Sequence, residues 1–107
     1  MIIIKTTTDT IKNAKFITDY LLKNKLVACA NLIKNAQSLF VWKNKISKLD
    51  EIIVLFKTKK GYEKKVYDVI SNLHSYDVPE ISTIKVSNIE KKYKNWLEET
   101  LSDKDIK

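Results

Sequence analysis

The hydrophobic and polar positions along this chain follow two periods, and the order in which these periods alternate predicts the elements of the fold. A short apolar run with β-branched residues, 1–6, predicts a buried first strand. Apolar residues then recur at helical spacing over 11–24, and residues 7–9 offer N-cap candidates. From 28 to 42 the pattern is extended, with a polar break at 34–37. The first half of the chain therefore predicts a strand, a helix and a long strand.

The second half repeats this alternation. Residues 43–50 are mostly polar and predict a hairpin turn, whereas Glu51 to Thr58 is apolar at both alternating positions. Such a run is typical of a central strand that is covered on both faces. A second helical pattern over 62–73 follows the only glycine, and residues 81–86 alternate as a strand. The helix and the strand are joined by a short polar segment.

The C-terminal part predicts one more helix. Apolar residues recur at helical spacing from Ile89 to Leu101, residues 87–88 are candidate caps, and residues 102–107 are expected to fray. The resulting order, β-α-β-β-α-β followed by a helix, is that of the ferredoxin-like α+β sandwich. A chain of this length fits one domain, which we place at 1–101.

The long strand sets a geometric condition on the fold. A straight strand over 28–42 would measure roughly 50 Å, about twice the diameter expected for so small a domain. We therefore predict a bulge at 34–37 and a projecting arm from Ser38 to Glu51 that carries the apolar run 39–42. Such an arm predicts a homo-oligomer that is built by the pairing of edge strands.

Composition narrows the function classes. The net charge is +7, but every basic residue is a lysine, and lysine lacks the bidentate geometry with which arginine reads guanine and phosphate. Because the lysines are spread along the whole chain, we predict no specific nucleic-acid binding. No apolar run approaches the roughly 20 residues that span a bilayer, and the first residues lack the layout of a signal peptide, so we expect no membrane partner and a cytoplasmic location. The single cysteine, Cys29, has small apolar neighbours and is expected to be a buried, inert thiol.

The octapeptide from His74 to Ile81 holds the only histidine and the only proline of the chain, beside a tyrosine and two acids. Pro79 fixes the backbone and pushes Val78 towards an extended conformation, so the polar side chains of this segment are rigidly aimed. The sequence has no Gly-rich phosphate loop and no signature of an activated nucleophile, and one histidine alone would have to serve as base. We therefore predict a protein that is not an enzyme.

Taken together, several segments resemble the CutA divalent-cation tolerance proteins over nearly the whole chain. The resemblance includes the segment around the family's common cysteine, its aromatic hairpin, the Lys-Thr end of its central strand, its His-Pro-Tyr-x-x-Pro-Glu-Ile motif and its terminal Tyr-x-x-Trp-Leu. The matching segments are residues 25–33, 38–45, 55–58, 74–81 and 93–97. Asn44 replaces a usual glycine, and Ser75 replaces a usual proline. Asparagine also tolerates positive φ, so the turn can form.

The resemblance implies a ferredoxin-like subunit in a tight homotrimer, similar in architecture to PII signalling proteins, with clefts between subunits and a role in divalent-cation tolerance. In some relatives copper is attributed to a cysteine and two adjacent histidines, and the matching positions here are Lys5, Leu73 and His74. Because two of these three ligands are replaced, the resemblance leaves His74 as a weak ligand for Cu(II) or another divalent cation. We expect metal contact to be weak or indirect. The other interpretation is that His74 is a solvated or hydrogen-bonded helix cap.

Five residues are candidates to line such an intersubunit cleft: Trp42, Lys57, His74, Tyr76 and Glu80. A lysine, a carboxylate and an aromatic face would suit a small anionic or zwitterionic ligand. This hypothesis favours a PII-like sensor or an interaction scaffold that binds a small ligand or a partner protein. The competing interpretation is structural, with an ion pair between Lys57 and Glu80 and with the two aromatic residues as interface anchors.

Overall fold

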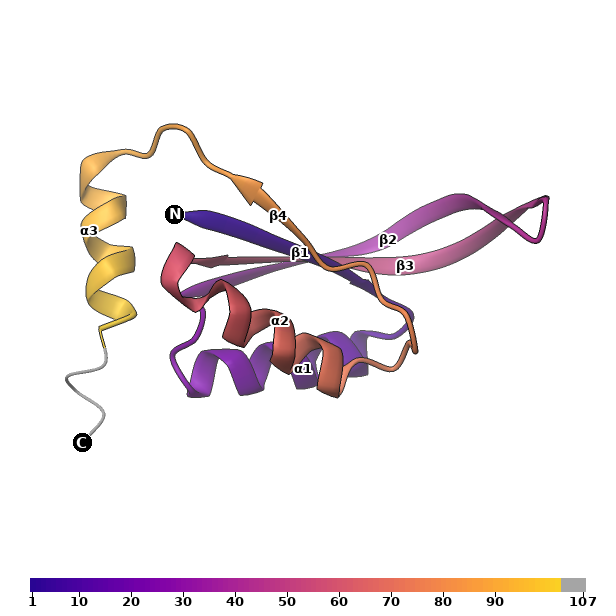
Figure 1. Ribbon diagram of the computed structural model, residues 1–107, viewed down its shortest axis with the longest axis horizontal. Coiled ribbons are helices and arrows are strands. Elements are labelled where there is room, and N and C mark those ends of the chain that lie inside the picture. Colours follow the sequence, from indigo (N-terminus) through magenta and orange to yellow (C-terminus); the bar gives the residue numbers. More distant parts are fainter. Residues whose placement is uncertain (103–107) are drawn as a thin grey trace.

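The computed structural model describes residues 1–102, which form a four-stranded antiparallel sheet with the strand order β2-β3-β1-β4 (Figure 1). The strands are β1 (Ile2–Thr8), β2 (Cys29–Trp42), β3 (Lys45–Thr58) and β4 (Ser82–Lys85). The helices are α1 (Ile11–Lys23), α2 (Glu63–Leu73) and α3 (Lys91–Thr100), and a single 3₁₀ turn, η1 (Lys60–Tyr62), leads into α2. The element order and the strand order are those of the ferredoxin-like sandwich, so the predicted α+β fold class is confirmed.

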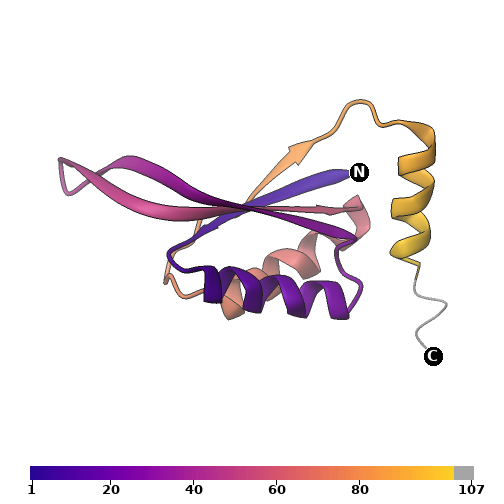
Figure 2. The same ribbon diagram turned by 180° about the vertical axis from the view of Figure 1, so that it is seen from behind.

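Helices α1 and α2 cover one face of the sheet, and the core lies between these two layers (Figures 1 and 2). The fully buried apolar side chains come from both layers: Ile4, Ala14, Ile17, Leu21, Val54, Phe56, Val66 and Ile70. Along β1 the burial alternates, since Ile2 and Ile4 are buried whereas Ile3 and Lys5 are only half-buried. The second face of the sheet is therefore not covered by α1 or α2, and of the described helices only α3 touches it, at Lys57. The prediction that residues 51–58 are covered on both faces is wrong for the subunit alone.

Strands β2 and β3 extend beyond the sheet as a two-stranded arm, which Figure 1 shows projecting away from the helices. The predicted bulge is present: Lys34 and Asn35 lie opposite Ile52, and Asn35 has a φ of 63°. The turn itself is shorter than the predicted 43–50, because only Lys43 and Asn44 form it, with φ values of 52° and 65°. A two-residue turn with positive φ at both positions has a backbone twist that matches the right-handed twist of the flanking strands. The residues after the turn continue as a strand because each residue from Lys45 to Asp50 pairs with a residue of β2.

Three predicted caps and boundaries differ from those in the structure. The N-cap of α1 is Thr10, whose hydroxyl accepts a hydrogen bond from the Asn13 N–H at 3.1 Å, whereas residues 7–8 belong to β1. The N-cap of α3 is Glu90, whose carboxylate accepts from the Tyr93 N–H at 3.0 Å, instead of residues 87–88. In both cases several consecutive residues could cap, and the path of the chain from the sheet into the helix decides which one does. Strand β4 is also shorter than the predicted 81–86.

Helix α3 lies at the end of the sheet opposite the arm, where Leu97 and Leu101 are buried (Figure 2). Of the predicted frayed tail, only Ser102 is described, and residues 103–107 lie outside the described residues. No helix within residues 1–102 is long and apolar enough to cross a membrane.

We expect the substitution Thr18→Val to stabilise the protein. The Thr18 hydroxyl lies buried on the core side of α1 and has no hydrogen-bond partner among residues 1–102. An unsatisfied buried hydroxyl costs roughly 1 kcal/mol or more, and valine has the same shape without the polar atom. The free energy of unfolding should therefore rise by about 1 kcal/mol in urea denaturation at fixed protein concentration. The control is Thr100→Val at the half-buried end of α3, and an equal gain there would contradict the argument.

Candidate functional site

A polar cluster forms where the loop after α2 passes the end of β1 and reaches the base of the arm. The loop supplies His74 and Tyr76, β3 supplies Glu51, and β2 supplies Ser38. Proline at position 79 and the end of α2 at Leu73 fix the path of this loop. Residues that are up to 38 positions apart in sequence are joined here through a chain of hydrogen bonds.

Both ring nitrogens of His74 are occupied by backbone and hydroxyl groups. The Tyr76 N–H donates to Nδ1 at 3.0 Å, so the proton of the neutral ring lies on Nε2, which donates to the Thr7 carbonyl at 2.8 Å and lies 3.1 Å from the Thr6 hydroxyl. Burial lowers the pKa of His74 below its ordinary value, although the Thr7 carbonyl and the nearby acids Asp9 and Glu51 oppose the shift. His74 is thus a hydrogen-bonded cap of α2, as the second interpretation predicted.

Because the pKa of His74 is lowered in the folded state, we expect stability to fall as the pH drops below about 6.5. In that range the unfolded chain takes up a proton that the folded chain does not, so protons favour unfolding. The substitution His74→Gln should flatten the dependence of the unfolding free energy on pH between about 6.5 and 5. The measurement is urea denaturation across this range. Because the chain has no other histidine, the difference between the two proteins in this range can be assigned to His74. Parallel curves of unfolding free energy against pH would contradict the prediction.

Glu51 is the centre of the cluster. Its side chain is only 8% exposed, and its two oxygens accept hydrogen bonds from the Ser38 hydroxyl at 2.6 Å and the Tyr76 hydroxyl at 2.7 Å. Burial raises the pKa of the Tyr76 hydroxyl above its ordinary value, and the bond to Glu51 raises it further because it holds the phenolic proton. The ring of Tyr76 also packs against His74, with 4.9 Å between the ring centres. Tyr76 therefore keeps its proton and is a hydrogen-bond donor to the carboxylate.

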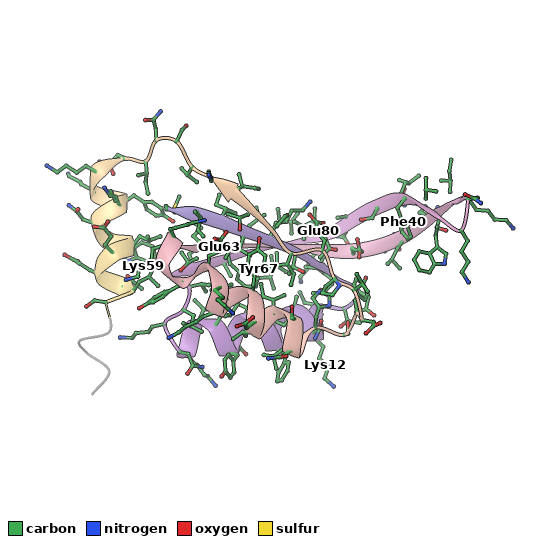
Figure 3. All side chains as sticks on the ribbon, viewed as in Figure 1. Lys12, Phe40, Lys59, Glu63, Tyr67 and Glu80 are labelled. Carbon is green, nitrogen blue, oxygen red and sulfur yellow. The ribbon has the colours of Figure 1, made fainter. Side chains whose placement is uncertain are left out.

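A cavity of about 440 Å³ opens beside this cluster on the uncovered face of the sheet. One wall carries the ion pair between Lys5 and Glu80, with 3.4 Å between Nζ and Oε2, and the Ser82 hydroxyl donates to the same carboxylate at 3.1 Å. Glu51 and Tyr76 also line the cavity. Figure 3 labels Glu80 beside the sheet and Phe40 on the arm. The lining residues are Lys5, Thr7, Ser38, Phe40, Leu49, Glu51, Ile53, Tyr76, Val78 and Glu80.

Of the five predicted cleft residues, the structure brings His74, Tyr76 and Glu80 to this region and places the other two elsewhere in the subunit. Lys57 lies near the far end of β3, where its Nζ donates to the Tyr93 hydroxyl at 3.3 Å and packs over that ring. Trp42 is 62% exposed at the tip of the arm.

The predicted ion pair between Lys57 and Glu80 is therefore wrong for the subunit. The antiparallel register places Lys57 opposite Ile3, whereas Lys5, two residues further along β1, reaches Glu80. Lys57 contacts Tyr93 instead, and Glu80 pairs with Lys5.

The residues present do not fit a copper site within one subunit. Lys5 pairs with Glu80, Leu73 packs against the core, and His74 uses both nitrogens in hydrogen bonds. Cys29 is half-buried rather than buried as predicted, but it lies opposite Lys57, roughly 13 Å along the sheet from the His74 contact at Thr7. Within residues 1–102 no three His, Cys, Asp or Glu side chains are grouped so that they could hold a metal ion. Borderline metals need several converging nitrogen or sulfur donors.

The functional residue that sequence reasoning missed is Glu51. It appeared only as the first residue of an apolar strand, and its neighbours Ile52 and Ile53 drew attention to the core. A signal was present, since a lone acid that begins a buried strand must find polar partners. The partners of Glu51 depend on the bulge in β2 and on the loop that carries Tyr76. The sequence alone therefore did not link Glu51 to Ser38 or to Tyr76.

Fold and site together define an α+β protein of the ferredoxin-like type, with a protruding β-arm and a polar pocket at its base. The family of CutA1 divalent ion tolerance proteins matches residues 2–100. The CutA divalent-cation tolerance protein of Thermotoga maritima is 36% identical over 101 residues, which cover 94% of this chain and 99% of the relative. The chain belongs to the CutA1 family, which is not a known family of enzymes.

Solved structures agree with this assignment. The CutA1 protein of Ehrlichia chaffeensis superposes with a TM-score of 0.90 at 34% identity, covering 94% of each chain. The protein of Archaeoglobus fulgidus, described as a periplasmic divalent cation tolerance protein, gives a TM-score of 0.90 at 31% identity over 95% of this chain and all of the relative. The resemblance that the sequence motifs indicated is confirmed.

Proposed function

We propose that this protein acts in divalent-cation tolerance as a homotrimer whose subunits hold one another through their β-arms. The observation that supports this most is the exposed apolar surface of the arm. Val41 and Ile46, which lie opposite each other across the arm, are 72% and 79% exposed, and Leu39, Phe40 and Trp42 are exposed as well. An apolar surface of this kind on a protruding ribbon is typical of a subunit interface.

Two further features support assembly. The outer edges of β2 and β4 are unpaired within residues 1–102, and unpaired edges are sites where strands of another subunit can add. The face of the sheet opposite α1 and α2 is only half-buried, although it carries Ile3, Ile53 and Leu55. Light scattering of the intact protein is expected to give a mass near three times the subunit mass of 12.5 kDa. A stable species of subunit mass at micromolar concentration would overturn the proposal.

We further propose that the contribution to metal tolerance is indirect, since each potential ligand among residues 1–102 is engaged elsewhere or stands apart from other ligands. Titration calorimetry of tag-free protein with Cu(II) is expected to show no stoichiometric binding in the sub-micromolar range. Tight binding that is lost in His74→Ala would show that histidines from several subunits converge on a metal. Loss of the protein from its host should still lower growth at raised copper concentration, and unchanged growth would contradict the role in tolerance.

A second candidate function is that of a PII-like sensor or scaffold that binds a small molecule or a partner protein in a cleft. The observation that favours it is the mixed pocket at the base of the arm, where a carboxylate, a phenol and an ion pair surround a cavity of about 440 Å³. Lys57 and Trp42 would join this pocket only through neighbouring subunits.

A thermal-shift screen of divalent metals, nucleotides and metabolites tests this second function. A ligand that binds only the native state raises the midpoint temperature with the logarithm of its concentration. A response to metabolites is the expected result, and no response to any set would favour a scaffold without a small ligand.

The predicted cytoplasmic location and the predicted lack of specific nucleic-acid binding stay predictions. The word periplasmic in the description of the Archaeoglobus fulgidus relative applies to that protein. Fractionation of the host cell checks the location, and a filter-binding assay at physiological salt checks the second prediction.

A further inference from the structure

Glu51 is the one buried residue with a charged side chain among residues 1–102. Burying a carboxylate costs several kcal/mol unless a cation or several donors compensate it. The two donors present, the hydroxyls of Ser38 and Tyr76, are neutral. Within the described residues no lysine forms an ion pair with Glu51, although the chain has 20 basic residues. Among residues 1–102 this carboxylate is therefore held by two neutral donors and pairs with no cation.

The space beside Glu51 has a definite chemical character. The cavity of about 440 Å³ is lined by apolar side chains, Phe40, Leu49, Ile53 and Val78, as well as by the carboxylate. Among the described residues, Lys5 is the only cationic group on its wall, and it is paired with Glu80, so an anionic ligand would meet no free positive charge from them there. A second cavity of about 480 Å³ also borders Glu51, and its lining adds two acids, Asp9 and Asp50, against one lysine, Lys34. The surroundings of Glu51 thus favour a cation.

We propose that this pocket binds the ammonium group of a small aliphatic amine, with Glu51 as the anchoring carboxylate and the apolar wall holding the hydrocarbon part. Each Glu51 oxygen accepts one hydrogen bond from the protein and can accept another, and an ammonium group offers three donors. A divalent metal ion fits less well, because the described residues offer no group of three ligands. The amine gains both a charge-assisted hydrogen bond and apolar burial.

This inference deepens the second candidate function and rests on it. The probe is n-butylammonium, which has one ammonium group and a short apolar chain, and the matched ligands are n-butanol and butyrate at the same concentration and ionic strength. Binding is measured on the assembled protein by NMR chemical-shift changes and by the shift in midpoint temperature. We expect butylammonium alone to bind, with the largest changes at Ser38, Tyr76 and Val78.

Two variants separate the role of the charge from that of the fold. Glu51→Gln keeps the shape and can still hydrogen-bond to both hydroxyls, but it removes the charge, so the affinity for butylammonium should fall at least tenfold. Glu98→Gln makes the same change at an exposed residue of α3 that lines neither cavity, and it should leave the affinity within about twofold. The mass of each variant by light scattering shows that assembly is retained.

The outcomes are distinguishable. If butylammonium fails to shift any resonance, or if both variants lose affinity equally, the amine inference is wrong. If Glu51→Gln instead dissociates the assembly, the missing cation comes from a second copy of the chain, which also overturns it. A response to a nucleotide or another metabolite without any response to amines would leave the second candidate function standing while this inference fails.

Discussion

The substitution Phe56→Ala should lower the free energy of unfolding by about 3–5 kcal/mol. Phe56 lies in β3, the second strand from one edge of the sheet, and its ring is fully buried between the sheet and α1 and α2. Removal of the ring loses its transfer free energy and leaves a cavity that the rigid strand cannot close. Because typical domains are stable by only about 5–15 kcal/mol, this loss approaches the limit of folding.

The measurement is urea denaturation followed by circular dichroism at one protein concentration, since assembly would add to the apparent stability. Phe16→Ala is the matched control, because the same side chain is 57% exposed on α1 and its removal should change stability by no more than about 0.5 kcal/mol. If the two variants lost equal stability, the assignment of Phe56 to the core would be contradicted.

The double substitution Val41→Glu with Ile46→Lys should convert the proposed trimer into single subunits. The two residues lie opposite each other in the arm, so the new side chains can form a cross-strand ion pair that keeps the hairpin intact. The arm would lose two of its most exposed apolar side chains, each worth roughly 2 kcal/mol when buried in an interface. That loss corresponds to roughly a thousandfold weaker association for each interface.

Light scattering of the wild type and the variant over a range of concentrations measures this effect. Phe16→Glu is the control, because it removes an exposed apolar side chain of α1 and should leave the mass unchanged. Circular dichroism shows whether the variant subunits keep their secondary structure. A trimer that survives the arm substitution would show that the arm is not the principal contact.

The order of the elements could be predicted from the sequence because each element reports its own periodicity. Three patterns predicted their elements to within a few residues of the observed bounds. They are the apolar run in β1, the helical spacing in α1 and α2, and the polar break at 34–37 in β2. The errors fall where local signals compete. Several consecutive residues could cap α1, and the polar residues between Lys45 and Asp50 resemble a loop although they pair with β2.

The candidate site was predicted less completely, and for a physical reason. His74, Tyr76 and Glu80 were found because they cluster in one octapeptide around the only proline. Glu51 was missed because its partners, Ser38 and Tyr76, lie 13 and 25 residues away and meet it only after the arm and the loop have formed. The structural interpretation named the wrong ion pair for the subunit, Lys57 with Glu80, because the sheet register, which no local pattern specifies, decides which lysine reaches Glu80.

The sequence by itself determined the class of fold, the need for a bent long strand with an apolar arm, and the family, since periodicity, chain length and local motifs carry this information. The tertiary structure alone decided that His74 uses both nitrogens in hydrogen bonds, that Lys5 neutralises Glu80, and that Glu51 is buried without a cation among residues 1–102. These facts depend on contacts between distant segments. Burial and pairing are properties of the packed chain, and they convert an ordinary acid at the start of a strand into the centre of the site.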